Sequence, residues 1–356
     1  MKKLKILLTF DYELPLGEAK DYQHALFKPA GDLIQLANQL NVPIVLFTDI
    51  CSALRFKEWD PDRYFIPFKN QIQGALRDGH DIQLHIHPHW MTSDYRDEAF
   101  LPSSDYSLSN FSTEKSGFTI ERIITSAFQE LTFLCKEADP DYECVAFRAG
   151  GYDVEPESKR ILTKLHDLGV RLESSVIKDL YLDFNFSHID YSDTPSSSQW
   201  FISRQGPLHV PSSNDLLELP VSSRPVQVSD IIVRRIKKML NSGLYKSRVY
   251  NNRGKGFLAI QGTQSLTSRI RKIFNPIVLS LDKEYLDCKD LESIVDYNIE
   301  KYKDEAHDLI VTVIGHPKSM GNYHLGLMEQ FVGKMKARFG DDVSFVTYRD
   351  LKNIFF

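Results

Sequence analysis

Three histidines alternate along one short segment of the chain. His85, His87 and His89 lie in Gly-His-Asp-Ile-Gln-Leu-His-Ile-His-Pro-His-Trp, residues 79–90, directly after a short apolar run. Neutral imidazole is the commonest protein ligand for zinc-like metals, and closely spaced histidines let one backbone segment present two nitrogens to one ion. A single histidine is usually a core or surface residue, but three within five positions are costly to explain by packing. The segment therefore predicts a metal site.

Two of these imidazoles with one carboxylate would leave an open position for water or substrate, as in hydrolytic rather than structural sites. We predict His85 and His89 as the nitrogen ligands, because Pro88 cannot donate a ladder hydrogen bond and the chain should turn there. His87 remains open as a third ligand or as a hydrogen-bonded neighbour. Zinc is the expected ion, with cobalt, nickel or manganese as alternatives.

Other polar residues follow other apolar runs. Asp11 comes after the first run, Arg148 after the fourth and His316 after a late one. In a parallel barrel the carboxyl ends of the strands meet at one face, where enzymes of this architecture keep their chemistry. Carboxylates and histidines also commonly cap strands, so the joint pattern matters more than any one residue. We predict Asp11 as a general base, Arg148 as the cation that keeps it ionised, and His316 as a general acid.

The elements that must position these residues alternate between short apolar runs and longer amphipathic stretches. Predicted strands are 4–10, 43–48, 81–86, 143–148, 170–176, 215–221, 309–315 and 343–347. Predicted helices are 24–40, 65–78, 118–137, 156–168, 286–304 and 325–339, with Gly169 and Gly340 as stops. Repeated βα units imply an α/β fold with a parallel sheet, open or closed into a barrel.

Composition narrows the class of protein. The 356 residues are 42% hydrophobic and 26% charged, which is typical of a soluble globular protein, and the net charge of −5 argues against a general nucleic-acid binder. The four cysteines form no Cys-x-x-Cys pair, so a reducing compartment is expected. The apolar run at 4–10 is too short for a signal peptide, and no stretch approaches the ~18 apolar residues of a spanning helix. We therefore expect a cytoplasmic protein without a transmembrane segment.

The ordered motifs resemble a known family. Leu-Thr-Phe-Asp11, the His85 to His89 segment, Phe-Arg148-Ala-Gly-Gly-Tyr152, Leu-Glu218-Leu-Pro and Gly-His316-Pro are similar, in order, to the motifs of the polysaccharide deacetylase superfamily. This is the NodB-homology group, carbohydrate esterase family four. The resemblance implies a distorted (β/α) barrel of about seven parallel strands, formed by residues 1–356 as a single domain. It also implies metal-dependent removal of an acetyl group from a sugar.

The resemblance also implies residue roles. Asp11 becomes the base that activates water, His85 and His89 the metal ligands, Arg148 the partner of Asp11, and His316 the acid. The backbone amide at Tyr152 would help to hold the oxyanion. The family's usual Asp-Asp pair is here Asp11-Tyr12, so Glu13 is the candidate carboxylate ligand, with Asp11 as the alternative. The Asp-Trp motif that normally tunes the late histidine is not evident, and Glu218 replaces it only in part.

Aromatic and polar side chains near these motifs suit a sugar. Flat apolar faces with a polar edge fit sugar rings, although aromatic residues also fill cores. The predicted substrate-binding residues are Tyr12, His87, Trp90, Tyr152 and Glu218.

A basic segment separates the last two motifs. Residues 231–281 contain eleven lysines and arginines and no aspartate or glutamate, within a predicted insertion at about 222–285. The segment predicts a docking surface for anionic lipid or a phosphorylated glycan, or else a solvated insertion paired with acidic neighbours.

The sequence thus favours a metal-dependent deacetylase acting on an N-acetylated sugar or glycolipid, in a surface polysaccharide or lipopolysaccharide precursor. Two alternatives stay open: a small-molecule amide hydrolase of the same barrel type, and a glycan-binding protein without metal.

Overall fold

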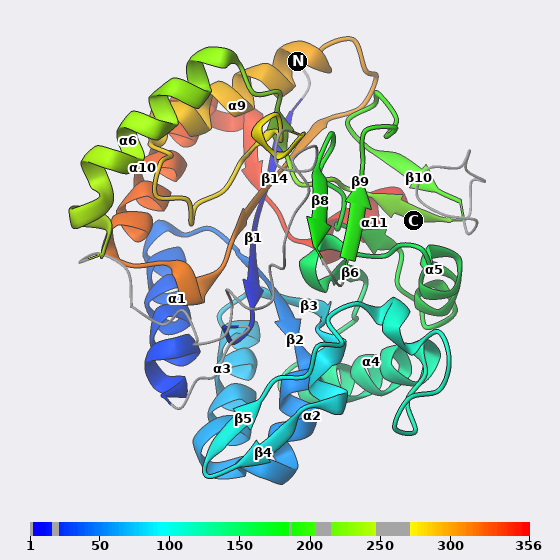
Figure 1. Ribbon diagram of the computed structural model, residues 1–356. Helices are drawn as coiled ribbons and strands as arrows, with labels where there is room; N and C mark the ends of the chain where they lie inside the picture. The colour runs from blue at the N-terminus through cyan, green and yellow to red at the C-terminus, as the bar shows by residue number, and fades with distance from the viewer. Residues whose placement is uncertain (1–2, 16–20, 185–186, 204–214, 247–270) are drawn as a thin grey trace.

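A curled, mostly parallel sheet forms the centre of the molecule, and helices surround it (Figure 1). The computed structural model describes residues 3–15, 21–184, 187–203, 215–246 and 271–356. Across the sheet the strands follow the order β10, β11, β7, β6, β3, β2, β1 and β14, and β15 pairs with the start of β1. Their bounds are β1 (Leu4–Tyr12), β2 (Val45–Asp49), β3 (Asp81–Ile86), β6 (Ala146–Ala149), β7 (Leu172–Glu173), β10 (Trp200–Ile202), β11 (Leu216–Glu218), β14 (Leu309–Gly315) and β15 (Val343–Phe345).

Backbone contacts curl the two ends of this sheet toward one another. After β11, Val221 bridges Thr312 of β14 in parallel, and the amide of Ser222 donates to the Thr312 carbonyl at 3.0 Å. Farther along, Ser280 bridges Ile314. The result is the distorted (β/α) barrel that the motifs predicted, with β10 added antiparallel to β11.

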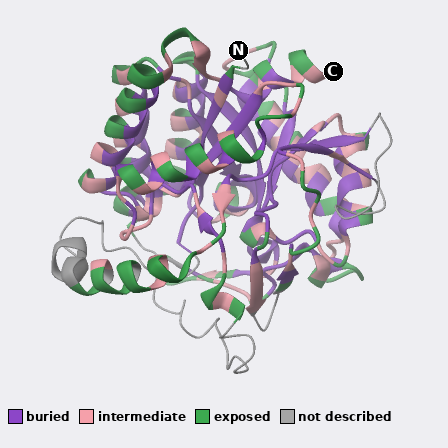
Figure 2. Cartoon of the chain, turned by 90° about the horizontal axis from the view of Figure 1, so that it is seen from above, coloured by how far each residue is buried: buried purple, intermediate pink, exposed green. Residues whose placement is uncertain are grey.

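Every residue of β14 is buried, as expected for a strand covered on both faces. Figure 2 shows the buried strands in the middle and the exposed residues mainly on the outer helices. The helices are α1 (Lys28–Leu40), α2 (Ile50–Trp59), α3 (Ile66–Arg77), α4 (Ile120–Lys136), α5 (Ser158–Asp167), α6 (Val228–Lys246), α9 (Cys288–Lys301), α10 (Asn322–Phe339) and α11 (Tyr348–Phe355). No helix within the described ranges has the length and apolar composition needed to cross a membrane.

Glycine and asparagine end several helices as the local chemistry requires. Gly169, after α5, has φ 100°, and Gly340, after α10, has φ 52°. Both backbones lie in the left-handed region, where glycine meets no Cβ penalty, so both predicted stops are confirmed. Asn41 ends α1 in the same way, with φ 50°.

The smaller elements lie between these. They include β4 (Asp94–Arg96), β5 (Ala99–Leu101), β8 (Tyr181–Phe184), β9 (Ser187–Asp190), β12 (Ser223–Arg224) and β13 (Ile277–Val278), together with short helical turns such as Pro88–Thr92 and Pro317–Ser319. The predicted insertion at about 222–285 is described only in part, because residues 247–270 lie outside the described ranges. The division of the chain into one domain with an insertion stays a prediction.

Candidate metal-binding and catalytic site

The carboxyl ends of β1, β3, β6 and β14 bring the motif residues together. His85 of β3 pairs in register with Arg148 of β6, and Phe10 of β1 pairs with Gly315 of β14. Asp11 and His316 follow directly on the latter pair. Because all four strands are parallel, side chains that are 137 and 305 positions apart in sequence lie in contact at this edge.

Glu13, His85 and His87 form a buried cluster. One ligand atom from each lies within 4.8 Å of the others. His85 Nε2 is 3.4 Å from Glu13 Oε2, and His87 Nε2 contacts the same oxygen directly. Two imidazole nitrogens and one carboxylate oxygen therefore point at one place.

The protonation pattern around this cluster suits a divalent cation. His85 Nδ1 lies 2.8 Å from the Arg148 carbonyl, which can only accept, so Nδ1 carries a proton and Nε2 is the nitrogen that can offer a lone pair to an ion. Burial would raise the pKa of Glu13, but Lys318, His87 and His85 outweigh it and hold that pKa well below its usual range. Lys318 Nζ donates to Glu13 Oε1 at 2.7 Å, which leaves Oε2 for the cluster. An ionised carboxylate and imidazole lone pairs are the donors that zinc prefers, so these residues fit the ion.

His89 lies outside this cluster, and its predicted pairing with His85 at a metal ion stays a prediction. Strand geometry continues through His87, so His85 and His87 point to the same side. Pro88 then begins the turn Pro88–Thr92, and the His89 ring packs between Trp90 and Tyr106, with ring centroids at 4.8 and 4.9 Å. Burial is the main reason that the pKa of His89 lies well below its usual value, and electrostatic repulsion from His87 lowers it further. Neither of its ring nitrogens has a hydrogen-bond partner among the described residues.

Asp11 is fixed by a fully buried guanidinium. Arg148 Nη1 donates to Asp11 Oδ1 at 2.7 Å, and Arg148 Nη2 donates to Thr9 Oγ1 at 2.9 Å. Arg148 also donates to the carbonyl and the hydroxyl of Ser174, and its guanidinium lies 4.1 Å from the centre of the Phe47 ring. The predicted contact between Arg148 and Asp11 is thus present, and the guanidinium makes further hydrogen bonds and a ring contact that fix its position.

His316 lies between two carboxylates. Its Nδ1 is 2.7 Å from Asp282 Oδ2, and its Nε2 is 3.4 Å from Asp11 Oδ2. Burial opposes the charge on Asp282, but Lys283 and His316 hold the pKa of Asp282 well below its usual range. Asp282 therefore fixes the imidazole with Nε2 directed at Asp11.

Asp282 was missed in the sequence, although a signal was present. It directly follows the mainly apolar run 277–281, in which Ser280 bridges Ile314 of β14. The rule that selected Asp11 and His316, a polar residue at the end of a buried run, applies equally to Asp282. The run was instead assigned to the basic insertion.

Two aromatic residues predicted to bind sugar lie in the core instead. Trp90 is 1% exposed, packs against Phe100, and donates from its indole nitrogen to Asp49 Oδ2 at 2.6 Å. Tyr12 is fully buried; its hydroxyl donates to Gln71, and its ring packs on Phe68. Alternation along β1 turns Tyr12 away from the side of Asp11 and Glu13, so neither aromatic face is open to a sugar ring.

Glu218 is also closed off from a substrate, whereas Tyr152 is half-buried. Glu218 has no exposed surface and accepts from the Val176 amide, and burial with the neighbouring Glu173 carboxylate raises its pKa well above the usual value. Tyr152 has φ 65°, directly after Gly151 with the same φ. Its carbonyl accepts a hydrogen bond from Tyr191 at 2.6 Å.

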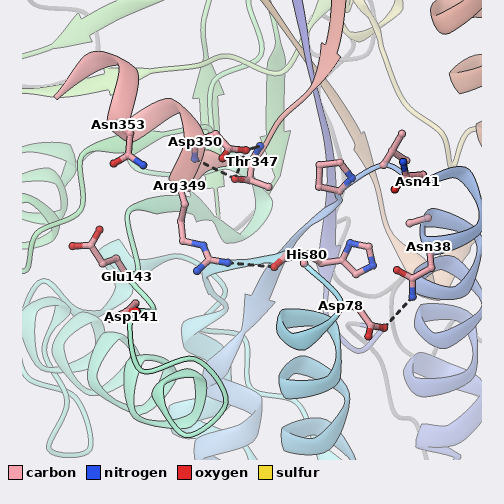
Figure 3. Close-up of a pocket in the computed structure, with 14 residues that line it drawn as sticks. Asn38, Asn41, Asp78, His80, Asp141, Glu143, Thr347, Arg349, Asp350 and Asn353 are labelled. Carbon is pink, nitrogen blue, oxygen red and sulfur yellow. Dashed lines mark hydrogen bonds between the residues drawn. The ribbon is translucent and has the colours of Figure 1, made fainter.

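A separate cavity of about 600 Å³ lies at the opposite ends of the strands (Figure 3). Asp78 and His80, just before β3, line it together with Thr347 and Arg349 near α11. Arg349 holds this region together, because its side chain donates to Asp139 at 2.7 Å and to Asp81 at 3.1 Å. None of the motif residues lines this cavity.

No family model and no curated protein matches the chain. Solved structures with a similar fold do match it. A protein from Mycobacterium smegmatis assigned as a polysaccharide deacetylase aligns over 99% of this chain and 90% of its own, with 13% identity and a TM-score of 0.50. A GH57-type branching enzyme from Pyrococcus horikoshii aligns over 100% of this chain and 70% of its own, with 9% identity and a TM-score of 0.51. The chain therefore has the barrel fold of polysaccharide deacetylases, as its motifs predicted.

Proposed function

We propose that this protein is a metal-dependent hydrolase that removes the acetyl group from an N-acetylated sugar. The observation that carries the proposal is the position of Asp11. Its carboxylate is held by Arg148 and lies 3.4 Å from His316, two residues before Glu13, which joins His85 and His87 in the cluster. A fixed carboxylate, an imidazole facing it and a cluster of metal donors are the three parts that amide hydrolysis needs.

Each residue has a defined part in the proposed reaction. Glu13, His85 and His87 would hold a divalent ion, which supplies Lewis acidity toward the acetyl carbonyl and the water. Asp11 accepts a proton from the water as the water oxygen attacks the carbonyl carbon. His316 Nε2 gives a proton to the amine nitrogen as the carbon–nitrogen bond breaks. Acetate and a free amino sugar result.

Two residues would position the others. Arg148 keeps Asp11 ionised and in place, and Asp282 keeps His316 Nε2 directed at the reacting atoms. The backbone amide at Tyr152 is the proposed donor to the oxyanion, in a turn of two consecutive residues with positive φ. Zinc is the proposed ion, with cobalt, nickel or manganese as alternatives.

The proposed substrate is a sugar of a surface polysaccharide or lipopolysaccharide precursor, and the proposed location is the cytoplasm. Four buried cysteines without disulfides support a reducing compartment.

Asp11→Asn provides the test. Acetate release from a panel of N-acetylated sugars, with small amides as the competing class, is measured for the wild type and the variant. We expect the variant to lose turnover by at least about 10²-fold while it keeps its fold and its zinc affinity, because Asp11 acts on the proton and not on the ion. Wild-type turnover by Asp11→Asn would contradict the mechanism, and release from small amides alone would contradict the substrate class.

A further inference from the structure

Helix α6 carries an apolar stripe on its outer side. Val228, Ile232, Ile236 and Met239 follow one another at spacings of four, four and three residues, which places them on one helix face. Their exposed fractions are 73%, 57%, 47% and 73%. Single exposed apolar residues are ordinary, but four in line on one helix form a patch that marks an interaction surface.

The opposite side of α6 faces the protein. Lys237 Nζ donates to Asp287 and to Asp290 near the start of α9, at 2.8 Å each. Before the helix, Arg224 pairs with Asp230 in its first turn, at 2.7 Å. Around the helix axis, Lys237 is rotated by about 100° from Ile236 and by about half a turn from Val228 and Met239. These ion pairs therefore hold α6 near the start of α9 with its stripe turned outward, at the edge of the molecule (Figure 1).

Positive charge borders the stripe. Arg235 is exposed, and it lies three residues after Ile232 and four before Met239, so it is a direct neighbour of the stripe. The wider segment 231–281 has eleven lysines and arginines and no acidic residue, although the whole chain has a net charge of −5. Within α6 itself, Val228–Lys246, the sequence has five lysines and arginines and one aspartate, so the helix that carries the stripe is basic.

We propose that the α6 stripe, Val228, Ile232, Ile236 and Met239, docks the protein on a bilayer that contains anionic phospholipid. An exposed apolar face bordered by cations is the pattern of helices that lie in the plane of a membrane surface. The acyl boundary would cover the stripe, and the phosphate groups would meet Arg235 at its border.

Other partners match this surface less well. A second copy of the chain would bring two basic α6 helices together, because a two-fold contact places the same patch against itself. A nucleic acid would satisfy the cations but leave the apolar stripe in water. An anionic membrane surface satisfies both features.

The test is co-sedimentation of the full-length chain with vesicles of phosphatidylcholine alone or of phosphatidylcholine with phosphatidylglycerol. We expect binding to the anionic vesicles alone, weakened by high salt. The double variant Ile232→Ser/Ile236→Ser should bind at least about tenfold less, and Arg235→Glu should also bind less. Phe133→Ser is the matched control, because Phe133 is 58% exposed on α4, away from this surface; it should bind like the wild type.

The outcomes separate this inference from the proposed function. Acetate release from a soluble substrate should be the same in all these variants, because none of them touches the strand-end site. Absence of binding to anionic vesicles, or equal binding by the double variant, overturns the proposal. A dimer in sedimentation equilibrium that the double variant abolishes, without vesicle binding, would assign the stripe to a second copy and overturn it as well.

Discussion

The imidazole of His316 is held by Asp282, with Nδ1 2.7 Å from Oδ2 of that carboxylate. A carboxylate on one ring nitrogen fixes the tautomer and the direction of the other nitrogen. Here the other nitrogen, Nε2, lies 3.4 Å from Asp11. The ion pair between Asp282 and His316 thus supports the proposed role of His316 as the acid.

Asp282→Asn should lower turnover by about 10–100-fold with little change in KM, because the imidazole loses the anion that fixes it but the substrate loses no contact. Steady-state kinetics measures this split. Ser280→Ala is the control: the Ser280 hydroxyl donates to the other oxygen of Asp282 at 2.5 Å, and its loss should cost far less. Equal kcat values for Asp282→Asn and the wild type would disprove the role.

Arg148→Met should destabilise the fold by about 3–5 kcal/mol, because it leaves the buried Asp11 carboxylate without its cation. The hydroxyls of Thr9 and Ser174 would also lose a donor. Urea unfolding followed by circular dichroism measures the loss. Arg148→Lys restores the charge but not the fork of donors, so it should recover only part of the stability. A loss below about 1 kcal/mol in Arg148→Met would contradict this account of the pair.

Glu218→Gln should stabilise the protein, increasingly so as the pH rises. Burial and Glu173 raise the pKa of Glu218 well above its unfolded value, so the folded state holds a proton that the unfolded state has released. Stability is therefore lost as the pH rises from the unfolded pKa toward the folded one, by up to about 1.4 kcal/mol per pH unit. Glutamine carries no charge and keeps an acceptor for the Val176 amide. Unfolding free energies at pH 5 and pH 8 should differ less in the variant; an identical pH dependence would refute the assignment.

Asp49→Ala should weaken zinc binding by about 10–100-fold, although Asp49 is not itself in the cluster. Its Oδ1 accepts from the His87 amide at 3.2 Å, and its Oδ2 accepts from the Trp90 indole. Removing the carboxylate frees the turn that aims His87 at Glu13. Calorimetric titration with zinc measures the affinity. Trp90→Phe, which removes one of the two bonds, should show an intermediate effect, and unchanged affinity in Asp49→Ala would count against the role.

The strand ends were predictable because a buried parallel strand is a nearly continuous apolar run, and the next polar residue marks its end. That rule located Asp11, Arg148 and His316, and the contact between Asp11 and Arg148 follows from it. Helix α2 was not predicted, because it begins directly after β2 and its buried residues, Ile50, Cys51, Ala53 and Phe56, continue the apolar run of the strand.

The conformation of the chain after β3 could not be predicted from the sequence. Which imidazole joins His85 depends on where strand geometry stops, and Pro88 gives that point only to within a residue or two. The structure keeps His87 extended and turns the chain at Pro88, so His87 joins Glu13 and His89 packs with Tyr106. The burial of Trp90 has a similar origin, because its partner Asp49 is 41 residues away in sequence.

The need for an ion is measured as acetate release from an N-acetylated sugar, by protein stripped with a chelator and again after zinc is restored. We expect release to stop on stripping, to return with zinc in the wild type, and not to return in Glu13→Gln, whose carboxylate ligand is gone. Release that continues undiminished in the stripped protein, or that zinc restores equally in Glu13→Gln, would contradict the proposed metal dependence.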